Sequence, residues 1–339
     1  MGRESIISFP GLGIEEFVLN REAISFKIGN FPVVIMWYGI IICLGIFAGF
    51  FYFAYRAKQQ KLVFDDVIDI TLVTVITAVA GARLYYVVFY GGYLETDGTF
   101  IENVLGSLYN IIAVWNGGLA IYGGIIFGAL AVILMSRKKK VSFFKLADMV
   151  TPGVMLGQLI GRWGNFCNGE AFGAETTLPW RMGLCNSETH YKTLYVHPTF
   201  FYESLWNLIG FTLINIFYKK RKYHGEVALW YFTWYGLGRA FIELLRTDSL
   251  MIGPFRVSSM LSFLLVLVLV PIGILLRVAC AKYTKAGLLK EGEIASIREI
   301  IAIARGKNNA GSDDASASEN KENAEHTAES EETENGTDH

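Results

Sequence analysis

The sequence has little charge for its length. Only 18% of its 339 residues are charged and 53% are hydrophobic, whereas about a quarter of the residues of a soluble domain are usually charged. The shortage is uneven, because the last thirty-five residues, from Arg305, are polar and acidic with almost no large apolar side chain. The rest of the chain is therefore too apolar for a soluble globular protein, and we predict a polytopic membrane protein.

Cysteine is also scarce, and the four cysteines show no CxxC pair and no metal-ligand spacing. We therefore expect no metal centre. Cys167 and Cys185 are predicted to share one side of the membrane, so a disulfide between them is an alternative to two free thiols. The first twenty residues lack a continuous apolar run and an Ala-x-Ala site, which argues against a cleavable signal peptide.

Long apolar runs dominate what is present. A membrane-spanning helix needs about 20 mostly apolar residues, because each residue adds ~1.5 Å across a ~30 Å hydrocarbon core. Seven segments meet this length: residues 33–55, 66–90, 117–135, 143–166, 197–218, 226–246 and 257–279. The sequence therefore predicts an all-α integral membrane protein with seven transmembrane helices.

The distribution of lysine and arginine predicts the orientation of these helices. Twelve basic residues follow the first, third and fifth segments, whereas the three alternate loops contain three. Basic loops stay in the cytoplasm. The N-terminus is therefore predicted to lie outside and the C-terminus in the cytoplasm.

The chain is predicted to have four parts. Residues 1–32 form an extracytoplasmic segment, and residues 33–280 form the transmembrane domain. Residues 281–304 have the pattern of an amphipathic helix on the inner membrane surface. Residues 305–339 have the low-complexity, acidic composition of a disordered tail.

Ionisable residues gather at one predicted depth of the membrane, in its outer half. The topology places there the arginines and glutamates Arg83, Arg162, Glu170, Glu203, Arg239, Glu243 and Arg246. Tyr235, Arg239, Glu243 and Arg246 have the spacing of one helical face. One arginine near a helix end could simply reach its head group to the membrane surface. So many charges from several helices instead predict a functional cavity, and guanidinium groups suit a phospholipid phosphate.

The segment GRWGNFCNGEAFG, residues 161–173, contains Arg162 and Glu170 of this predicted cavity. It resembles the signature of the prolipoprotein diacylglyceryl transferases, Gly-Arg-x-Gly-Asn-Phe-x-Asn-x-Glu-x-x-Gly, at every fixed position. Five further segments are similar to that family: MWYG at 36–39, GARLYYVVFY at 81–90, WNGGLAIYGG at 115–124, HPTFFYE at 197–203 and YGLGRAFIELLR at 235–246.

The resemblance implies an activity and a location. Such an enzyme transfers the diacylglyceryl group of phosphatidylglycerol to the lipobox cysteine of a prolipoprotein and releases glycerol-1-phosphate. It is a multi-pass protein of the bacterial cytoplasmic membrane with its active site toward the extracytoplasmic side. Its partners are phosphatidylglycerol, other membrane lipid and prolipoprotein lipobox segments. No cofactor and no nucleic acid are implied.

The resemblance also implies roles for residues. The family's essential arginines fall on Arg162 and Arg239. Its signature asparagine and glycine fall on Asn165 and Gly173, and its first-helix tyrosine falls on Tyr38. The expected catalytic residues are Arg162, Arg239, Tyr122, Asn165, Glu243 and Tyr235. The expected lipid-binding residues are Arg162, Arg239, Arg246, Arg83, Tyr38, Asn168, Glu170 and Gly173.

The general base is the open question. Many family members have histidine where this chain has Tyr122. A tyrosine hydroxyl is a weak base unless its surroundings change it, so either the environment of Tyr122 is unusual or another group accepts the proton. His197 is an alternative base, although a His-Pro pair at a helix start is commonly structural.

Three other functions fit an apolar chain with buried charges. A transporter or flippase of an anionic lipid also needs an arginine cluster, but it should show inverted repeats or broken helices at mid-membrane. An intramembrane protease needs a catalytic constellation that the sequence does not place at membrane depth. A retinal protein needs a Schiff-base lysine in the seventh segment, which has none.

Overall fold

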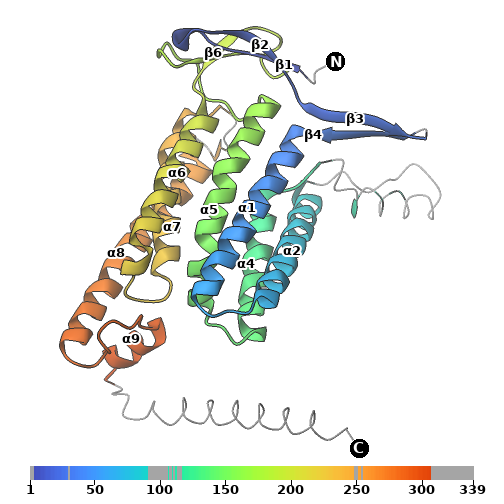
Figure 1. Ribbon diagram of the computed structural model, residues 1–339. Coiled ribbons are helices and arrows are strands. Elements are labelled where there is room, and N and C mark those ends of the chain that lie inside the picture. Colours follow the sequence, from blue (N-terminus) through green and yellow to red (C-terminus); the bar gives the residue numbers. More distant parts are fainter. Residues whose placement is uncertain are drawn as a thin grey trace, which may run out of the picture. The chain divides into compact units, whose positions relative to one another are not determined.

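The computed structural model describes residues 4–29, 31–90, 106, 109, 111–112, 117–247, 251–252 and 255–306. The chain divides into two compact units, Met1–Gly273 and Ile274–His339. The described part is mostly helical (Figure 1). The predicted disordered tail lies outside the described residues from position 307 onward, so it stays a prediction.

Each of the seven predicted apolar segments is a helix over most of its length. The helices are α1 (Trp37–Gln59), α2 (Phe64–Tyr90), α4 (Ile121–Lys138), α5 (Phe143–Asn168), α6 (Thr199–Phe217), α7 (Glu226–Ile242) and α8 (Val257–Lys285). Among the described residues, four of them are long and apolar enough to cross a membrane: α1, α2, α4 and α8. The number of spans and their orientation remain predictions.

The region predicted as a surface helix, residues 281–304, is only partly helical. Helix α8 continues to Lys285, and a separate short helix, α9, covers Ile297–Ala304. The start of α9 is fixed by a capping box, in which the Ser296 hydroxyl accepts from the Glu299 N–H and the Glu299 carboxylate accepts from the Ser296 N–H.

Short strands were not expected, and the prediction of an all-α fold is wrong in this respect. A four-stranded antiparallel sheet has the order β2-β1-β5-β6, formed by β2 (Ile14–Asn20), β1 (Glu4–Phe9), β5 (Met182–Cys185) and β6 (Leu194–Val196). Strands β3 (Glu22–Ile28) and β4 (Phe31–Met36) form a hairpin, and so do β7 (Met251–Ile252) and β8 (Phe255–Arg256). These strands are too short to be recognised as apolar runs of about 20 residues.

The sheet lies at the end of the helix bundle where α5 ends and α6 begins (Figure 1). Ile7 of β1, Leu184 of β5 and Val196 of β6 are fully or almost fully buried in one cluster with Phe200 of α6. Strands from the start and from the middle of the sequence thus share one core with the first turn of α6.

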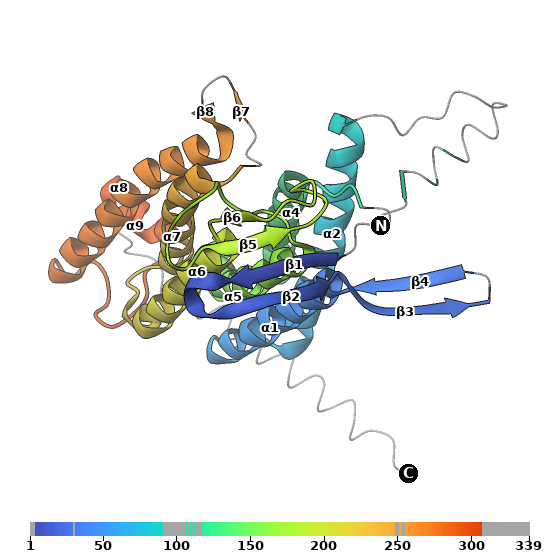
Figure 2. The ribbon, with the colours of Figure 1, turned by 90° about the horizontal axis from the view of Figure 1, so that it is seen from above.

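Helices α1 and α5 lie side by side, with α2 and α4 on one side of them and α6 and α7 on the other (Figures 1 and 2). Glycines allow this close approach. A Cβ atom at Gly49 of α1 would lie 3.0 Å from the carbonyl oxygen of Gly153 of α5, and one at Gly153 would lie 2.8 Å from that of Gly49. Small residues at such crossings let helix backbones pack closely within a membrane.

Two tryptophans fix the register of α6 against α7. The rings of Trp206 and Trp234 stack with centroids 4.4 Å apart. Each indole N–H donates to the other residue's backbone carbonyl at 2.8 Å. Because Trp206 lies one turn after Glu203 and Trp234 lies just over one turn before Arg239, this pair sets the height at which those two side chains meet.

The glycine contact between α1 and α5 gives a test of the fold. Gly153→Ala should lower the unfolding free energy by about 1–3 kcal/mol, because the added methyl group meets the backbone of α1. Gly124→Ala on α4 is the matched control, since the nearest atom to its new Cβ would lie at 3.6 Å. Thermal unfolding in detergent measures both, and equal midpoints for the two variants would contradict the packing described here.

Candidate active site

The candidate active site is built around one buried carboxylate, that of Glu203 in the second turn of α6. Glu203 is only 4% exposed. Its Oε2 lies 2.6 Å from Arg162 Nη2, and its Oε1 lies 3.2 Å from Arg239 Nη1 and 3.3 Å from Arg246 Nη1. Arginines from α5, from α7 and from the segment after α7 therefore meet on a single side chain.

A second carboxylate completes this cluster. Glu243 is 2% exposed, and its Oε2 lies 2.8 Å from Arg239 Nη2 and 4.0 Å from Arg246 Nε. Three guanidinium groups are thus in direct contact with two carboxylates. The group carries an excess of positive charge, which favours a bound anion.

The backbone at the end of α7 differs from the expected single helical face. Helix α7 ends at Ile242, a 3₁₀ turn, η4, covers Glu243–Leu245, and Arg246 is extended. The prediction of a continuous helical face through Arg246 is therefore wrong. Arg246 still joins the cluster, because the turn directs its side chain back to Glu203.

The polar residues of the signature segment support Arg162. Arg162 Nη1 lies 3.5 Å from Asn165 Oδ1, at the limit of a hydrogen bond. Asn165 Nδ2 and Asn168 Nδ2 donate to Glu170 Oε1 at 3.0 and 3.2 Å. Helix α5 ends here because Gly169 adopts a left-handed conformation, with φ at +59°.

Gly173 brings the signature segment against η4. Its N–H donates to the His197 carbonyl at 3.0 Å, and it forms a β-bridge with Arg246. A Cβ atom at this position would lie 2.7 Å from the Cβ of His197 and 3.0 Å from the carbonyl oxygen of Leu245. Only glycine fits this approach, so the residue acts through the backbone rather than through a side chain.

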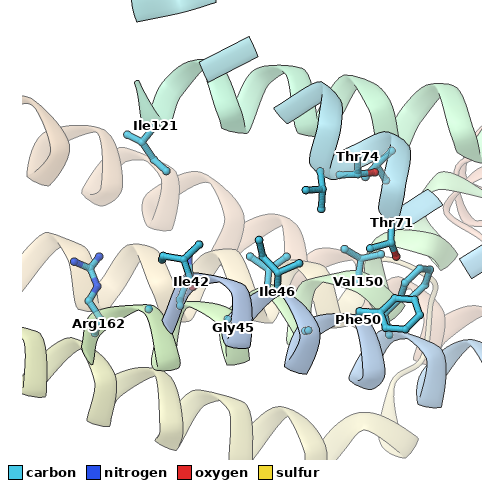
Figure 3. A pocket seen from close by; sticks show the side chains of 18 of the residues that line it. Ile42, Gly45, Ile46, Phe50, Thr71, Thr74, Ile121, Val150 and Arg162 are labelled. Carbon is cyan, nitrogen blue, oxygen red and sulfur yellow. The ribbon is translucent and has the colours of Figure 1, made fainter. Parts of the chain in front are cut away.

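An apolar cavity of about 540 Å³ opens beside the cluster, among α1, α2, α4 and α5. Tyr38, Arg162 and Asn165 belong to its lining. Figure 3 shows Arg162 at one end and Phe50, Thr71 and Thr74 at the other. Most of the remaining wall is aliphatic or glycine, so a charged end and a hydrocarbon-lined interior occur in one space.

Comparisons with known proteins show the family of the chain. A family model described as prolipoprotein diacylglyceryl transferase matches residues 23–275. The chain is 40% identical over 262 residues to the phosphatidylglycerol–prolipoprotein diacylglyceryl transferase of Listeria monocytogenes, covering 76% of this chain and 90% of that protein. For the enzymes of the same name from Streptococcus pneumoniae and Acaryochloris marina, the identity is 41% over 248 residues and 42% over 244 residues, covering 72% and 70% of this chain and 90% and 85% of theirs.

The chain belongs to the prolipoprotein diacylglyceryl transferase family. It is a multi-pass membrane transferase of this bacterial family, and the resemblance of its signature segment is confirmed.

Of the residues expected in this transferase site, Arg83 lies apart from the cluster. It is on α2, on the far side of α1 and α5 from α6 and α7 (Figures 1 and 2). Its Nε donates to the Ile111 carbonyl at 2.9 Å, and its Nη1 donates to the carbonyls of Gly117 and Gly118 at 2.6 and 2.8 Å. Arg83 therefore holds the chain that leads into α4.

Tyr122, Tyr235 and His197 each have an aromatic neighbour. Tyr122 of α4 is 37% exposed, and its ring is tilted against Tyr85 at a centroid distance of 6.5 Å. Tyr235 stacks on Tyr231 at 6.1 Å. His197 Nδ1 lies 3.3 Å from the Tyr202 hydroxyl.

Trp115 and Asn116 of the WNGGLAIYGG segment lie outside the described residues. Cys167 and Cys185 are free thiols.

Sequence reasoning placed Glu203 in the charged cluster but gave it no role. The available signal was its position in HPTFFYE, where it directly follows three aromatic residues. A carboxylate among so many aromatic side chains needs a cation. Which cations it binds depends on the pairing of α6 with α5 and α7, and this pairing is a property of the fold.

Glu203→Gln tests the role of this carboxylate. The change leaves three guanidinium groups facing one another without their shared anion, so we expect a loss of about 3–5 kcal/mol in unfolding free energy. Glu170→Gln is the matched control. The Glu170 carboxylate accepts hydrogen bonds from two neutral amides, and the amide oxygen of glutamine can accept the same bonds. Its expected loss, measured by thermal unfolding in detergent, is below about 1 kcal/mol. The same small loss for Glu203→Gln would contradict the description of the cluster.

Proposed function

We propose that the protein transfers the diacylglyceryl group of phosphatidylglycerol to the lipobox cysteine of prolipoproteins, forming a thioether and releasing glycerol-1-phosphate. The observation that carries this proposal is the meeting of Arg162, Arg239 and Arg246 on Glu203, together with the place of Arg162 in the lining of an apolar cavity. A phosphate with a lipid attached needs this combination of charge and hydrocarbon surface.

The reaction is a displacement at carbon. The substrate thiol loses its proton to a base, and its sulfur forms a bond to the glycerol carbon that bears the phosphate oxygen. The carbon–oxygen bond breaks, and its electron pair stays on the phosphate oxygen, which leaves with glycerol-1-phosphate. Negative charge therefore grows on that oxygen. Arg239 and Arg162, already fixed by Glu203, stabilise this charge without reorganising.

Most of the remaining polar residues hold the phosphate-binding arginines. Arg246 and Glu243 keep Arg239 in place, and Asn165, Asn168 and Glu170 support Arg162. Tyr38 lines the same end of the cavity. One acyl chain lies along the cavity wall between Arg162 and Val150, which are twelve residues apart on α5, or about 18 Å. This length is slightly more than half of the ~30 Å hydrocarbon core, and it suits the chain of a lipid in one leaflet.

The topology belongs to the same proposal. Seven spans with the N-terminus outside would place the ends of α5 and α7 and the starts of α1 and α6 at the extracytoplasmic surface, where secreted prolipoproteins emerge. The support is the excess of lysine and arginine in the opposite loops. The products separate this function from a lipid flippase: purified protein, phosphatidylglycerol and a lipobox peptide should yield glycerol phosphate and a heavier peptide.

Arg239→Ala tests the assignment of the phosphate-binding arginines. Removing one preorganised donor at a developing negative charge should lower kcat at least about 100-fold. Labelled phosphatidylglycerol and a lipobox peptide in detergent provide the assay. Arg137→Ala, at the exposed end of α4, serves as the control and should keep its activity. Activity of Arg239→Ala within about threefold of the unchanged protein would end this assignment.

Tyr122→Phe tests Tyr122, one of the two candidate bases. The change removes only the hydroxyl group, so loss of a general base should lower kcat about 100-fold at neutral pH. His197→Asn is measured beside it as the alternative base. A Tyr122→Phe variant with full activity, together with an inactive but folded His197→Asn variant, would transfer the proton-accepting role to His197.

A further inference from the structure

The apolar cavity that begins at Arg162 ends against the hydrophobic core of the bundle. One side chain from each of four helices lines this far end: Phe53 of α1, Ile70 of α2, Val132 of α4 and Val150 of α5. All four belong to one buried cluster or pack against it. Each lies six or seven residues, or about 10 Å, from the nearer end of its helix. The four side chains therefore form a floor at a single depth.

The residues behind this floor oppose any further passage. Ala57 and Leu146, of the same buried cluster, have no exposed surface. Just beyond the end of α4, Lys139 Nζ lies 2.6 Å from Asp66 Oδ1 and 2.6 Å from Asp69 Oδ2, and these ion pairs tie that end to the start of α2. A hydrocarbon chain that passed the floor would have to displace a packed core and would then meet charged groups, and both are unfavourable.

Phe50 is a bulky part of this far end. It lies three residues before Phe53 on α1 and also lines the cavity. Its ring packs edge-on against Phe64, the first residue of α2, with the ring centroids 6.1 Å apart. Figure 3 shows Phe50 and Val150 together at the end away from Arg162. A hydrocarbon chain that enters beside Arg162 and follows α5 therefore meets the Phe50 ring where the cavity ends.

The position of the floor sets the length of the cavity. Val150 lies twelve residues before Arg162 on α5, which is about 18 Å along the helix axis. An extended chain advances roughly 1.2 Å per bond, because the three backbone bonds of one residue span about 3.3–3.6 Å. The cavity therefore has room for about 15 bonds, counted from the phosphate end of a lipid through its glycerol and ester group into one acyl chain.

We propose that this floor, and Phe50 in particular, limits the length of one acyl chain of the phosphatidylglycerol that the enzyme uses. The other chain stays in the surrounding lipid, so its length has no limit. Chains that fit should react at similar rates, because their hydrocarbon moves from one apolar environment to another. A chain beyond the limit must force apart a packed core, and it is therefore a poor substrate. This inference deepens the proposed function and rests on it.

The test is a series of phosphatidylglycerols that differ only in chain length, each assayed with a lipobox peptide in detergent. For the unchanged protein, kcat/KM should stay level up to a limiting length and then fall at least about fivefold. Phe50→Ala removes part of the floor, so the limit should move to chains about two or more carbons longer. Val150→Phe fills the same end, so the limit should move to shorter chains.

Phe51→Ala is the matched control, because it is the same substitution at the next residue of α1. Phe51 is 65% exposed and lies outside the cavity lining, so this variant should keep the limit of the unchanged protein. The readout compares lipids on one protein preparation. A smaller folded fraction of any variant lowers all rates together and leaves the limiting length as it was.

Two mixed lipids, each with one long and one short chain in opposite order on the glycerol, make the test independent of any variant. Only one chain enters the cavity, so only one of the two mixed lipids should be a poor substrate for the unchanged protein. Equal rates throughout the series, equal losses on both mixed lipids, or the same limit in Phe50→Ala and Phe51→Ala would each overturn the inference. Failure of the unchanged protein to modify the peptide with any lipid would instead overturn the proposed function.

Discussion

The arrangement of the site depends on the interaction of one carboxylate with three guanidinium groups. Glu203 meets Arg162, Arg239 and Arg246 where α5, α6 and the end of α7 come together. In a poorly solvated place, three like charges within reach of one another repel strongly unless an anion lies between them. Glu203 is that anion, and the stacked pair of Trp206 and Trp234 keeps it at the height of Arg239.

This arrangement explains how a buried ion cluster can also bind a substrate. The side chains of Arg162 and Arg239 keep 19% and 18% of their surface exposed, whereas that of Arg246 keeps 10%. In the proposed function, the first two donate to an incoming phosphate, while Glu243 holds Arg239 through an ion pair. Because the guanidinium groups are fixed before the lipid arrives, little reorganisation is needed as charge moves to the leaving phosphate. In the same proposal, the apolar cavity beside Arg162 receives the hydrocarbon.

The sequence predicted the helices well, because long apolar runs mark the helical segments, whereas the orientation inferred from the basic loops stays a prediction. It also brought Arg162, Arg239 and Glu243 into one site by depth alone. It could not predict the strands, which are only two to seven residues long, or the pairing of β1 with β5 across a long sequence separation, as between Ile7 and Leu184. It placed Arg83 in the cluster because the depth of a residue does not tell on which side of the helix bundle it lies. In the structure, Arg83 instead donates to the backbone carbonyls before α4. The role of Glu203 likewise required the packing of three helices.

The most direct measurement of the central claim is a double-mutant cycle on Arg162 and Arg239, each changed to Met, with kcat/KM for peptide lipidation as the readout. If both arginines act together on one phosphate from one shared carboxylate, the double variant should lose little more activity than the worse single variant. A double variant whose loss equals the product of the two single losses would show two independent sites, and it would contradict the account of a single cluster organised by Glu203.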